Sequence, residues 1–400
     1  MGLCHLNSSP GSKLTCGRCQ LHLRCVKFNW ASDAIVHSVQ GSIIVIFLLF
    51  CLLLAVPFVA RSQSEATASK TEILPIVSYD TDTGLGYGAK LFVLNRVGLK
   101  ESFDLVLFNS TKGERWFKLV FSVPDFEMRQ GTVYPLAMDV TIDYDKWTNN
   151  SFFGIGNTSN FSDREYYTKE PVELSLVFCR GFSQQWVGQA GLRFRAVRNF
   201  GFSPASRLAK LEPAFNRSRV SYTSLLLVWR YDTRDSYVNP TNGLVVQGET
   251  EFAPAIGFND VSFARFSVWM QRYSSLLSNK VVLALRLGMQ GLAGSELPVQ
   301  VLLPIGGNST LRGSPQDRYL DKTAALCNLE IRFPIYWRLG GVVGADAGKV
   351  WKDISRTDLT RWASNPLAGL RLYMDTFVVR LDVGFGRETT GFYLNFGHIF

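Results

Sequence analysis

Residues 376–387 read TFVVRLDVGFGR, and apolar side chains alternate with polar or small ones along this stretch. One face carries Phe377, Val379, Leu381, Val383 and Phe385. The other face carries Val378, Arg380, Asp382, Gly384 and Gly386. A period of two residues is that of a β-strand, whereas an amphipathic helix repeats every 3.6 residues. The stretch therefore predicts a strand with one face in an apolar medium and the other in a polar one.

The same period continues from about residue 74 to the end of the chain, for example in VVLALRLGMQ (281–290) and GFYLNFGHIF (391–400). A soluble β-sandwich also alternates, because it buries apolar faces against each other. Here, however, the predicted strands are about ten residues or longer, which suits a tilted membrane crossing. Arginine, aspartate and glycine lie at mid-strand on the other face, as a wet lumen would require. The pattern favours an all-β fold, a transmembrane antiparallel β-barrel of about sixteen strands.

The connections between the predicted strands alternate between long and short. The longest spans residues 292–323, whereas turns such as PTN (240–242) and LSN (277–279) are short. Long loops outside the cell and short periplasmic turns are typical of outer-membrane barrels. The sequence thus predicts one long extracellular loop between two strands of the barrel.

An apolar run, IIVIFLLFCLLLAVPFVA, occupies residues 43–60 and precedes the polar stretch RSQSEATASK. We interpret it as the core of a secretory signal peptide, with a retained anchor helix as the alternative. The predicted organisation is an upstream segment with signal peptide at 1–64, a short periplasmic stub at 65–73 and the barrel at 74–400.

The composition argues against several functional classes. The formal net charge is +9, without a continuous run of Lys or Arg, so the sequence does not suggest nucleic-acid binding. Only Cys179 and Cys327 follow the predicted signal peptide, which disfavours a disulfide framework. His398, on the apolar face of the last predicted strand, is the one histidine there, so a Ser-His enzyme or a Cys/His metal site is not expected. We predict neither a catalytic residue nor a cofactor.

Four segments together resemble the barrel of the BamA/TamA superfamily, the outer-membrane assembly factors also called bacterial surface antigens. They are TLRGS (310–314), LEIRFPI (329–335), VVGADAGKVW (342–351) and YDTRDSYVNPTNG (231–243). The resemblance covers roughly residues 73–400. It implies an assembly barrel that helps to insert or translocate polypeptides, and whose first and last strands open towards the membrane. Members usually carry POTRA domains ahead of the barrel, and none is expected here, so a separate periplasmic partner protein is one expectation.

The resemblance also implies a lock between the 292–323 loop and the lumen. Arg312 is expected to contact Glu330 and Asp346, which the strand parity places on lumen faces, and Gly313 is expected to allow a tight turn. The alternative is an ordinary solvated loop arginine. Ser314 departs from the motif, because an aromatic residue usually stands there.

Two further sets of residues are candidates. In the turn near residue 240, Asp232, Arg234 and Asp235 would form an ion-pair network or a solvated charge cluster, beside Pro240 and Gly243. In the last strand, the predicted terminal signal for barrel assembly comprises Phe392, Leu394, Phe396 and Phe400.

The expected partners are outer-membrane lipid, unfolded barrel substrates and a periplasmic protein. The alternative function is a passive channel or surface antigen whose lumen the 292–323 loop plugs. Both readings place the protein in the outer membrane.

Overall fold

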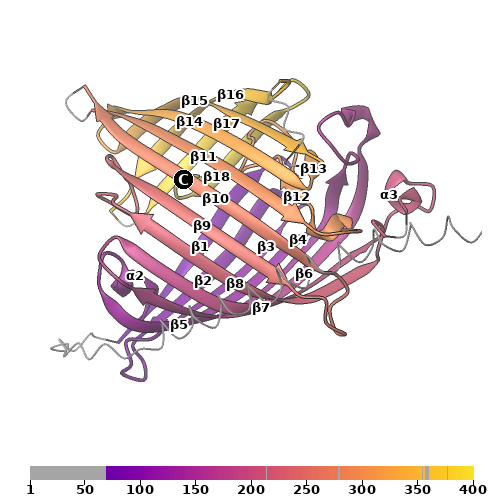
Figure 1. Ribbon diagram of the computed structural model, residues 1–400. Coiled ribbons are helices and arrows are strands. Elements are labelled where there is room, and N and C mark those ends of the chain that lie inside the picture. Colours follow the sequence, from indigo (N-terminus) through magenta and orange to yellow (C-terminus); the bar gives the residue numbers. More distant parts are fainter. Residues whose placement is uncertain (1–68, 213, 278–279, 354, 356–359, 376) are drawn as a thin grey trace, which may run out of the picture. The chain divides into compact units, whose positions relative to one another are not determined.

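The computed structural model describes residues 69–400, apart from 213, 278–279, 354, 356–359 and 376. Sixteen strands of the described residues form one closed antiparallel barrel (Figure 1). The first eight are β1 (Lys70–Asp80), β2 (Gly84–Leu94), β3 (Ser102–Ser110), β4 (Glu114–Val123), β5 (Tyr134–Phe152), β6 (Glu165–Gly181), β7 (Trp186–Phe200) and β8 (Arg219–Asp232). The other eight are β9 (Gly243–Ala253), β10 (Phe263–Leu276), β11 (Val281–Ala293), β14 (Thr323–Tyr336), β15 (Leu339–Trp351), β16 (Ala363–Tyr373), β17 (Val378–Phe385) and β18 (Thr390–Phe396). The predicted transmembrane-type barrel is confirmed.

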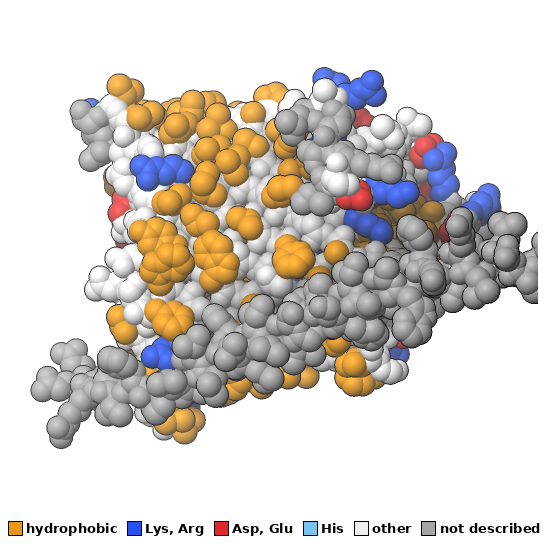
Figure 2. Space-filling view, viewed as in Figure 1, with side chains coloured by type: hydrophobic (Ala, Val, Ile, Leu, Met, Phe, Trp, Pro, Cys, Tyr) orange, Lys and Arg blue, Asp and Glu red, His pale blue; other side chains and the backbone are white. Residues whose placement is uncertain are grey.

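Alternation along each strand separates the two surfaces of the wall. On β17, Leu381 is 42% exposed on the outside, whereas the next residue, Asp382, is completely buried inside. On β14, Leu329 and Ile331 point outward and Glu330 between them is buried. Figure 2 shows the resulting spread of hydrophobic side chains over the part of the outer wall that faces the viewer. An apolar outer surface of this kind is what a hydrocarbon environment requires.

Neighbouring strands of the barrel follow one another in sequence, with two exceptions. The first is the junction of β11 with β14, between which the chain forms the short strands β12 (Leu303–Ile305) and β13 (Tyr319–Asp321) as a separate pair. The second is the closure of the barrel, where β1 lies beside β18. Short helical turns occupy other connections, α2 (Phe126–Arg129), η1 (Phe161–Asp163), α3 (Arg207–Lys210) and η2 (Val299–Val301). None of the helices among the described residues has the length and apolar character to cross a membrane.

The inside of the barrel contains an apolar core as well as charged groups. Residues of the 292–323 segment pack there, with Leu297, Val301, Ile305 and Leu311 buried against inward residues of the wall such as Tyr222 on β8. The expectation of a wet lumen is therefore wrong for this part of the interior. Burial of the long connection against the wall excludes water that an open barrel would hold.

Strand β5 runs on to Phe152, because it stays paired with β6 across a register shift between Trp147 and Asn150. Two boundaries differ from the predicted ones. Strand β1 begins at Lys70, inside the predicted stub at 65–73, because Lys70 already pairs with Leu94 of β2. Strand β18 ends at Phe396 rather than at residue 400. The predicted upstream segment and signal peptide lie outside the described residues.

Candidate functional site: the lumen loop, the barrel seam and the terminal tail

The segment 306–319, here called the lumen loop, turns back on itself between β12 and β13. Its turn is closed by a hydrogen bond from the Gly307 N–H to the Ser314 carbonyl at 3.0 Å. Gly313 has a φ of 91°, and a Cβ there would lie 2.7 Å from backbone atoms of Gly384 and Gly386. Both the left-handed backbone and the close approach to β17 require glycine at this position. Gly313 therefore seats the loop directly on the inner face of the wall.

Arg312 next to it is fully buried and contacts three carboxylates. Its backbone N–H donates to Oδ2 of Asp346 at 3.0 Å, while Nε and Nη2 donate to the two oxygens of the same carboxylate at 2.8 and 2.9 Å. Nη1 donates to Glu330 and to Asp382, both at 2.7 Å. All three carboxylates are 0% exposed. The structure thus brings together the predicted Arg312, Glu330 and Asp346, and adds Asp382, a contact that the sequence does not predict.

The charge of Arg312 is maintained by these neighbours. Burial opposes the charged form, but the carboxylates of Asp346, Glu330 and Asp382 outweigh it and hold the pKa of Arg312 well above its usual range. Arg312 binds Asp346 through two of its nitrogens and shares the third, Nη1, between Glu330 and Asp382. These contacts use the planar guanidinium of arginine, a geometry that the ammonium group of lysine lacks.

Further arginines surround the same carboxylates. Arg332 on β14 donates to Glu330 at 2.8 Å, and Arg371 on β16 donates to Asp382 at 2.5 Å. Arg380 on β17 lies 3.5 Å from Asp382. The alternation in the stretch 376–387 places Asp382 and Arg380 on its polar face, so the sequence identifies both as lumen residues. It does not predict the contact of Asp382 with Arg312, because that contact joins segments that are distant in sequence.

Neutral side chains complete the attachment of the loop. Asn328 donates to Asp346 at 2.6 Å, and Asn365 donates both to the Arg312 carbonyl and to the Ser314 hydroxyl at 2.9 Å. The Gly313 N–H donates to the Tyr393 hydroxyl at 3.0 Å. Ser314, which replaces the aromatic residue of the motif, is thus held by an amide rather than by ring packing.

The lumen loop also reaches the other side of the barrel closure. The Gln316 N–H donates to Asp82, in the β1–β2 turn, at 2.7 Å. Arg318 forms a two-pronged contact with Glu388, in the β17–β18 turn, with both distances at 2.6 Å. One loop therefore contacts the turns on both sides of the junction between the first and last strands.

That junction, the seam, is short. Strands β1 and β18 pair through Tyr79 with Leu394 and Asp80 with Tyr393. Just beyond this pair, the Thr81 N–H donates to the Phe392 carbonyl at 3.2 Å, and the Phe392 N–H donates to the Thr81 hydroxyl at 2.7 Å. By contrast, β17 and β18 pair along seven positions, from Val379 with Phe396 to Phe385 with Thr390. On the seam side, the rest of β1, residues 70–78, has no partner strand among the described residues.

The last residues of the chain lie on both surfaces of the barrel wall, some on the outer face and some inside. Phe392 and Phe396 are exposed on the outer face of β18, and Leu394 shares their face. Gly397 then adopts a φ of 77°, and the following residues turn inward. Phe400 is only 8% exposed and lies inside the barrel against Tyr273 of β10. The prediction that Phe400 and His398 lie on the apolar face of the last strand is wrong, because the left-handed Gly397 ends that strand.

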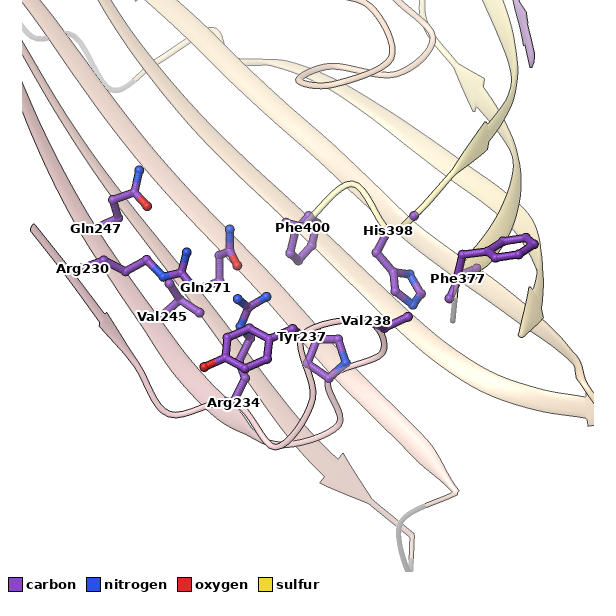
Figure 3. A pocket seen from close by; sticks show the side chains of 13 residues that line it. Arg230, Arg234, Tyr237, Val238, Val245, Gln247, Gln271, Phe377, His398 and Phe400 are labelled. Carbon is purple, nitrogen blue, oxygen red and sulfur yellow. The ribbon is translucent and has the colours of Figure 1, made fainter. Parts of the chain in front are cut away.

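The turn between β8 and β9 approaches this inward tail. Arg234 binds the carboxylate of Asp232 with Nη2 at 2.7 Å, as an ion-pair network would require, whereas Asp235 accepts from the backbone of Thr241 and Asn242 instead. Pro240 is buried, and Gly243 starts β9 with a φ of 121°. Asn239 Oδ1 lies 3.1 Å from Nε2 of His398, a contact without a sequence signal. Figure 3 shows His398 and Phe400 on one side of a cavity and Arg234 and Tyr237 on the other.

A closed barrel with an apolar outer surface and a charged interior defines the class of outer-membrane β-barrels. Within that class, the family model of the Omp85 superfamily domain matches residues 95–400, and the chain belongs to the Omp85 superfamily. The predicted resemblance is thereby confirmed. A comparison with curated protein sequences finds no match.

Solved structures support the same fold. The chain is similar to BamA from Haemophilus ducreyi lacking POTRA domains 1–3, with a TM-score of 0.62 and 15% identity over 82% of this chain and 70% of that one. It is similar to CdiB from Escherichia coli, with a TM-score of 0.58 and 12% identity over 83% of this chain and 68% of that one. CdiB from Acinetobacter baumannii matches with a TM-score of 0.51 and 16% identity over 83% and 66% of the two chains.

Proposed function

We propose that this chain assists the insertion or translocation of polypeptides at the bacterial outer membrane. The observation that carries the proposal is the short seam between β1 and β18, which pairs through Tyr79 with Leu394 and Asp80 with Tyr393 and ends where Thr81 bonds to Phe392. Few backbone hydrogen bonds have to break there for the wall to open towards the lipid.

The first strand offers a matching surface. Between residues 70 and 78, β1 is bonded to β2 on one side, while the backbone groups on its other side have no partner strand among the described residues. An unpaired strand edge is a template onto which another extended chain can add by main-chain hydrogen bonding. An incoming polypeptide would find such an edge at the place where the wall is weakest.

This mechanism requires no catalytic residue and no cofactor. It requires export to the outer membrane, for which the predicted signal peptide at residues 43–60 and the apolar outer wall argue. Outer-membrane lipid and unfolded polypeptide are the proposed partners, together with a separate periplasmic protein that delivers the substrate.

A second function is favoured by a different observation. The lumen loop lies inside the barrel and is held there by fully buried groups such as Arg312. A passive surface antigen or a plugged channel would need that loop but not the short seam.

Reconstitution distinguishes the two. The purified chain is placed in liposomes and supplied with an unfolded outer-membrane barrel, and folded substrate is scored by its heat-modifiable migration on a gel. Faster folding than in empty liposomes supports the proposal. Conductance across a planar bilayer without any gain in substrate folding would favour the channel.

A further inference from the structure

The outer wall is hollowed over β10, β11 and β14, three strands that neighbour one another in the barrel (Figure 1). The hollow, here called the outer groove, has a volume of about 990 Å³, which is at the upper end of the usual range for binding sites. Small outward residues form its floor, Gly291 on β11 with Ala325 and Cys327 on β14. The larger apolar residues that stand beside this floor are Phe266, Val268, Leu287 and Met289. The contrast in side-chain size therefore shapes a groove in an apolar wall.

A tryptophan lines the outer groove on the side of β15. Trp362 lies in the connection between β15 and β16, and its ring packs edge-on against Trp351 at the end of β15, with centroids 6.0 Å apart. Trp351 itself pairs with Thr323, the first residue of β14. Tryptophan is enriched where a membrane meets water. This end of the groove is therefore placed at the level of the lipid headgroups.

Two lysines line the same end of the outer groove. Lys352 follows β15 directly and is exposed. Lys322 precedes β14, and its ammonium group donates a long hydrogen bond of 3.3 Å to the Gly294 carbonyl. A lysine ammonium is a common ligand of phosphate, and a lysine close to a membrane surface attracts anionic lipid. The groove thus combines an apolar floor with ammonium groups at its rim, the order of an acyl chain and a phosphate in a lipid.

The rim also contains two carboxylates, and both accept hydrogen bonds from backbone N–H groups. Asp353 lines the groove and accepts from the Ser355 N–H at 2.9 Å. Asp321 is buried behind the rim, accepts from the Lys322 N–H at 2.8 Å and interacts electrostatically with both lysines. The formal charge of these four side chains is balanced. The lysines nevertheless present their ammonium groups to the groove, whereas the carboxylate of Asp321 does not line it.

We propose that the outer groove is a specific binding site for one phosphorylated glycolipid of the outer leaflet. Its phosphate lies between Lys322 and Lys352, and an acyl chain lies along the floor over Gly291 and Ala325. The rim is at the end of the barrel that carries the long connections, which in outer-membrane barrels lies outside the cell. In bacterial outer membranes, the phosphate-bearing lipid on that side is a glycolipid with several acyl chains. The inference goes beyond the proposed function and rests only on its outer-membrane location.

The test uses the chain refolded in detergent micelles and native mass spectrometry, which resolves each bound lipid by its mass. The probes are diphosphoryl lipid A, monophosphoryl lipid A and dipalmitoylphosphatidylglycerol, each titrated separately. One variant, Lys322→Ala/Lys352→Ala, removes the ammonium groups, and a second, Ala325→Leu, fills the floor. Heat-modifiable migration establishes that each variant is folded.

Each variant has a matched control. Lys70→Ala/Lys280→Ala removes two exposed lysines at the opposite end of the barrel. Ala345→Leu enlarges an exposed alanine of β15 that does not line the groove.

We expect the intact chain to bind one diphosphoryl lipid A at least about tenfold more tightly than phosphatidylglycerol, with monophosphoryl lipid A between them. The lysine variant should weaken the binding of diphosphoryl lipid A by about tenfold or more, because both phosphate ligands are lost. Ala325→Leu should weaken both forms of lipid A by the same factor, because it blocks the acyl chain rather than the phosphate. Both control variants should bind as the intact chain does.

Equal affinity for lipid A and phosphatidylglycerol, or equal affinity of the lysine variant and its control, would overturn the site. A dimer of the chain that Ala325→Leu disrupts would show that a second copy covers the groove, and would overturn it as well. Binding of lipid A by a barrel that shows no insertion activity would instead overturn the proposed function and leave the outer groove in place.

Discussion

Arg312 and Asp346 are joined by three hydrogen bonds inside the barrel, one from the backbone N–H and two from the guanidinium. The pair connects a loop to the middle of a strand that lies 34 residues further along the chain. Because both side chains are fully buried, neither can replace its partner with bulk water. The position of the lumen loop therefore depends on this pair more than on any exposed contact.

Replacing Arg312 with alanine should release the lumen loop. Removal of one member of a buried ion pair typically costs about 3–5 kcal/mol, and here three carboxylates lose a common partner. We expect faster protease cleavage between residues 292 and 323 in the folded barrel. Arg312→Lys should restore protection only in part, because an ammonium group cannot bond to both oxygens of Asp346 in the plane of a fork.

Arg338→Ala provides the matched control. Its ion pair with Asp375 joins the β14–β15 and β16–β17 turns at the surface, where such a pair contributes about 0–1 kcal/mol. Equal cleavage rates for the Arg312 and Arg338 variants would mean that the loop is held by its apolar residues alone.

A double-mutant cycle should detect coupling within the pair. Arg312→Ala and Asp346→Asn each remove the same interaction, so the double variant should be less destabilised than the sum of the two single variants. Urea unfolding of the detergent-solubilised barrel, followed by tryptophan fluorescence, measures the free energies of unfolding. Strict additivity would show that the two residues act independently.

Much of the fold could be predicted from the sequence, because the alternation of side chains is a local property of each strand. The stretch 376–387 contains its own evidence of an outer and an inner face, and β17 (Val378–Phe385) follows it closely. The packed interior could not be predicted in the same way. Whether Leu297 or Leu311 contacts water or the barrel wall depends on how the 292–323 segment folds back into the barrel. The sequence of this segment has no periodic pattern that would predict that path.

In the candidate site, too, local patterns could be predicted from the sequence and long-range contacts could not. Strand parity and a motif together predict Glu330 and Asp346 as partners of Arg312, whereas nothing in the sequence links Arg312 to Asp382, which lies 70 residues away. Phe400 was placed on the wrong surface because the period of two was extended across Gly397. A glycine near the end of a strand pattern was the available signal, since glycine readily adopts the positive φ that ends the alternation.

The two terminal phenylalanines should respond differently to substitution. Phe396 is 42% exposed on the outer wall, so Phe396→Asp places a charge on the lipid face. The cost is about 2–4 kcal/mol at the bilayer midplane and less near the rim, and we expect less folded barrel in cells. Phe400→Asp introduces its charge beside Arg286 and Arg332 instead. It should be tolerated better in heat-modifiability assays, and a greater loss for Phe400→Asp would argue against the inward position of the tail.

Acid should loosen the tail through His398. Burial, followed by the charges of Arg332 and Arg371, holds the pKa of His398 well below its usual range, while Glu330 opposes this and Arg380 adds to it. A released tail recovers an ordinary histidine pKa of about 6.5. The stability of the inward position is thus fully present above that pH and decreases as pH falls below it, by at most about tenfold in the equilibrium per pH unit.

A spin label attached at Ile399→Cys, with the other cysteines replaced, reports this change. The label should be immobilised at pH 8 and increasingly mobile towards pH 5. His398→Asn, which can still bond to Asn239 but does not titrate, should remove the dependence on pH. A mobile label at both pH values would exclude histidine as its cause.

The central claim is that the wall opens between Tyr79 and Leu394, and a disulfide across that pair tests it most directly. These residues face each other across the seam, at a spacing that suits a disulfide between antiparallel strands. Leu394 also faces Leu381 of β17, so Leu381→Cys with Leu394→Cys gives a control in which the same residue is joined to the other neighbour. In liposomes, the oxidised Tyr79→Cys/Leu394→Cys barrel should fail to fold an unfolded barrel substrate and should regain activity on reduction, while the control pair stays active in both states. Full activity of the barrel with its seam cross-linked would contradict the account.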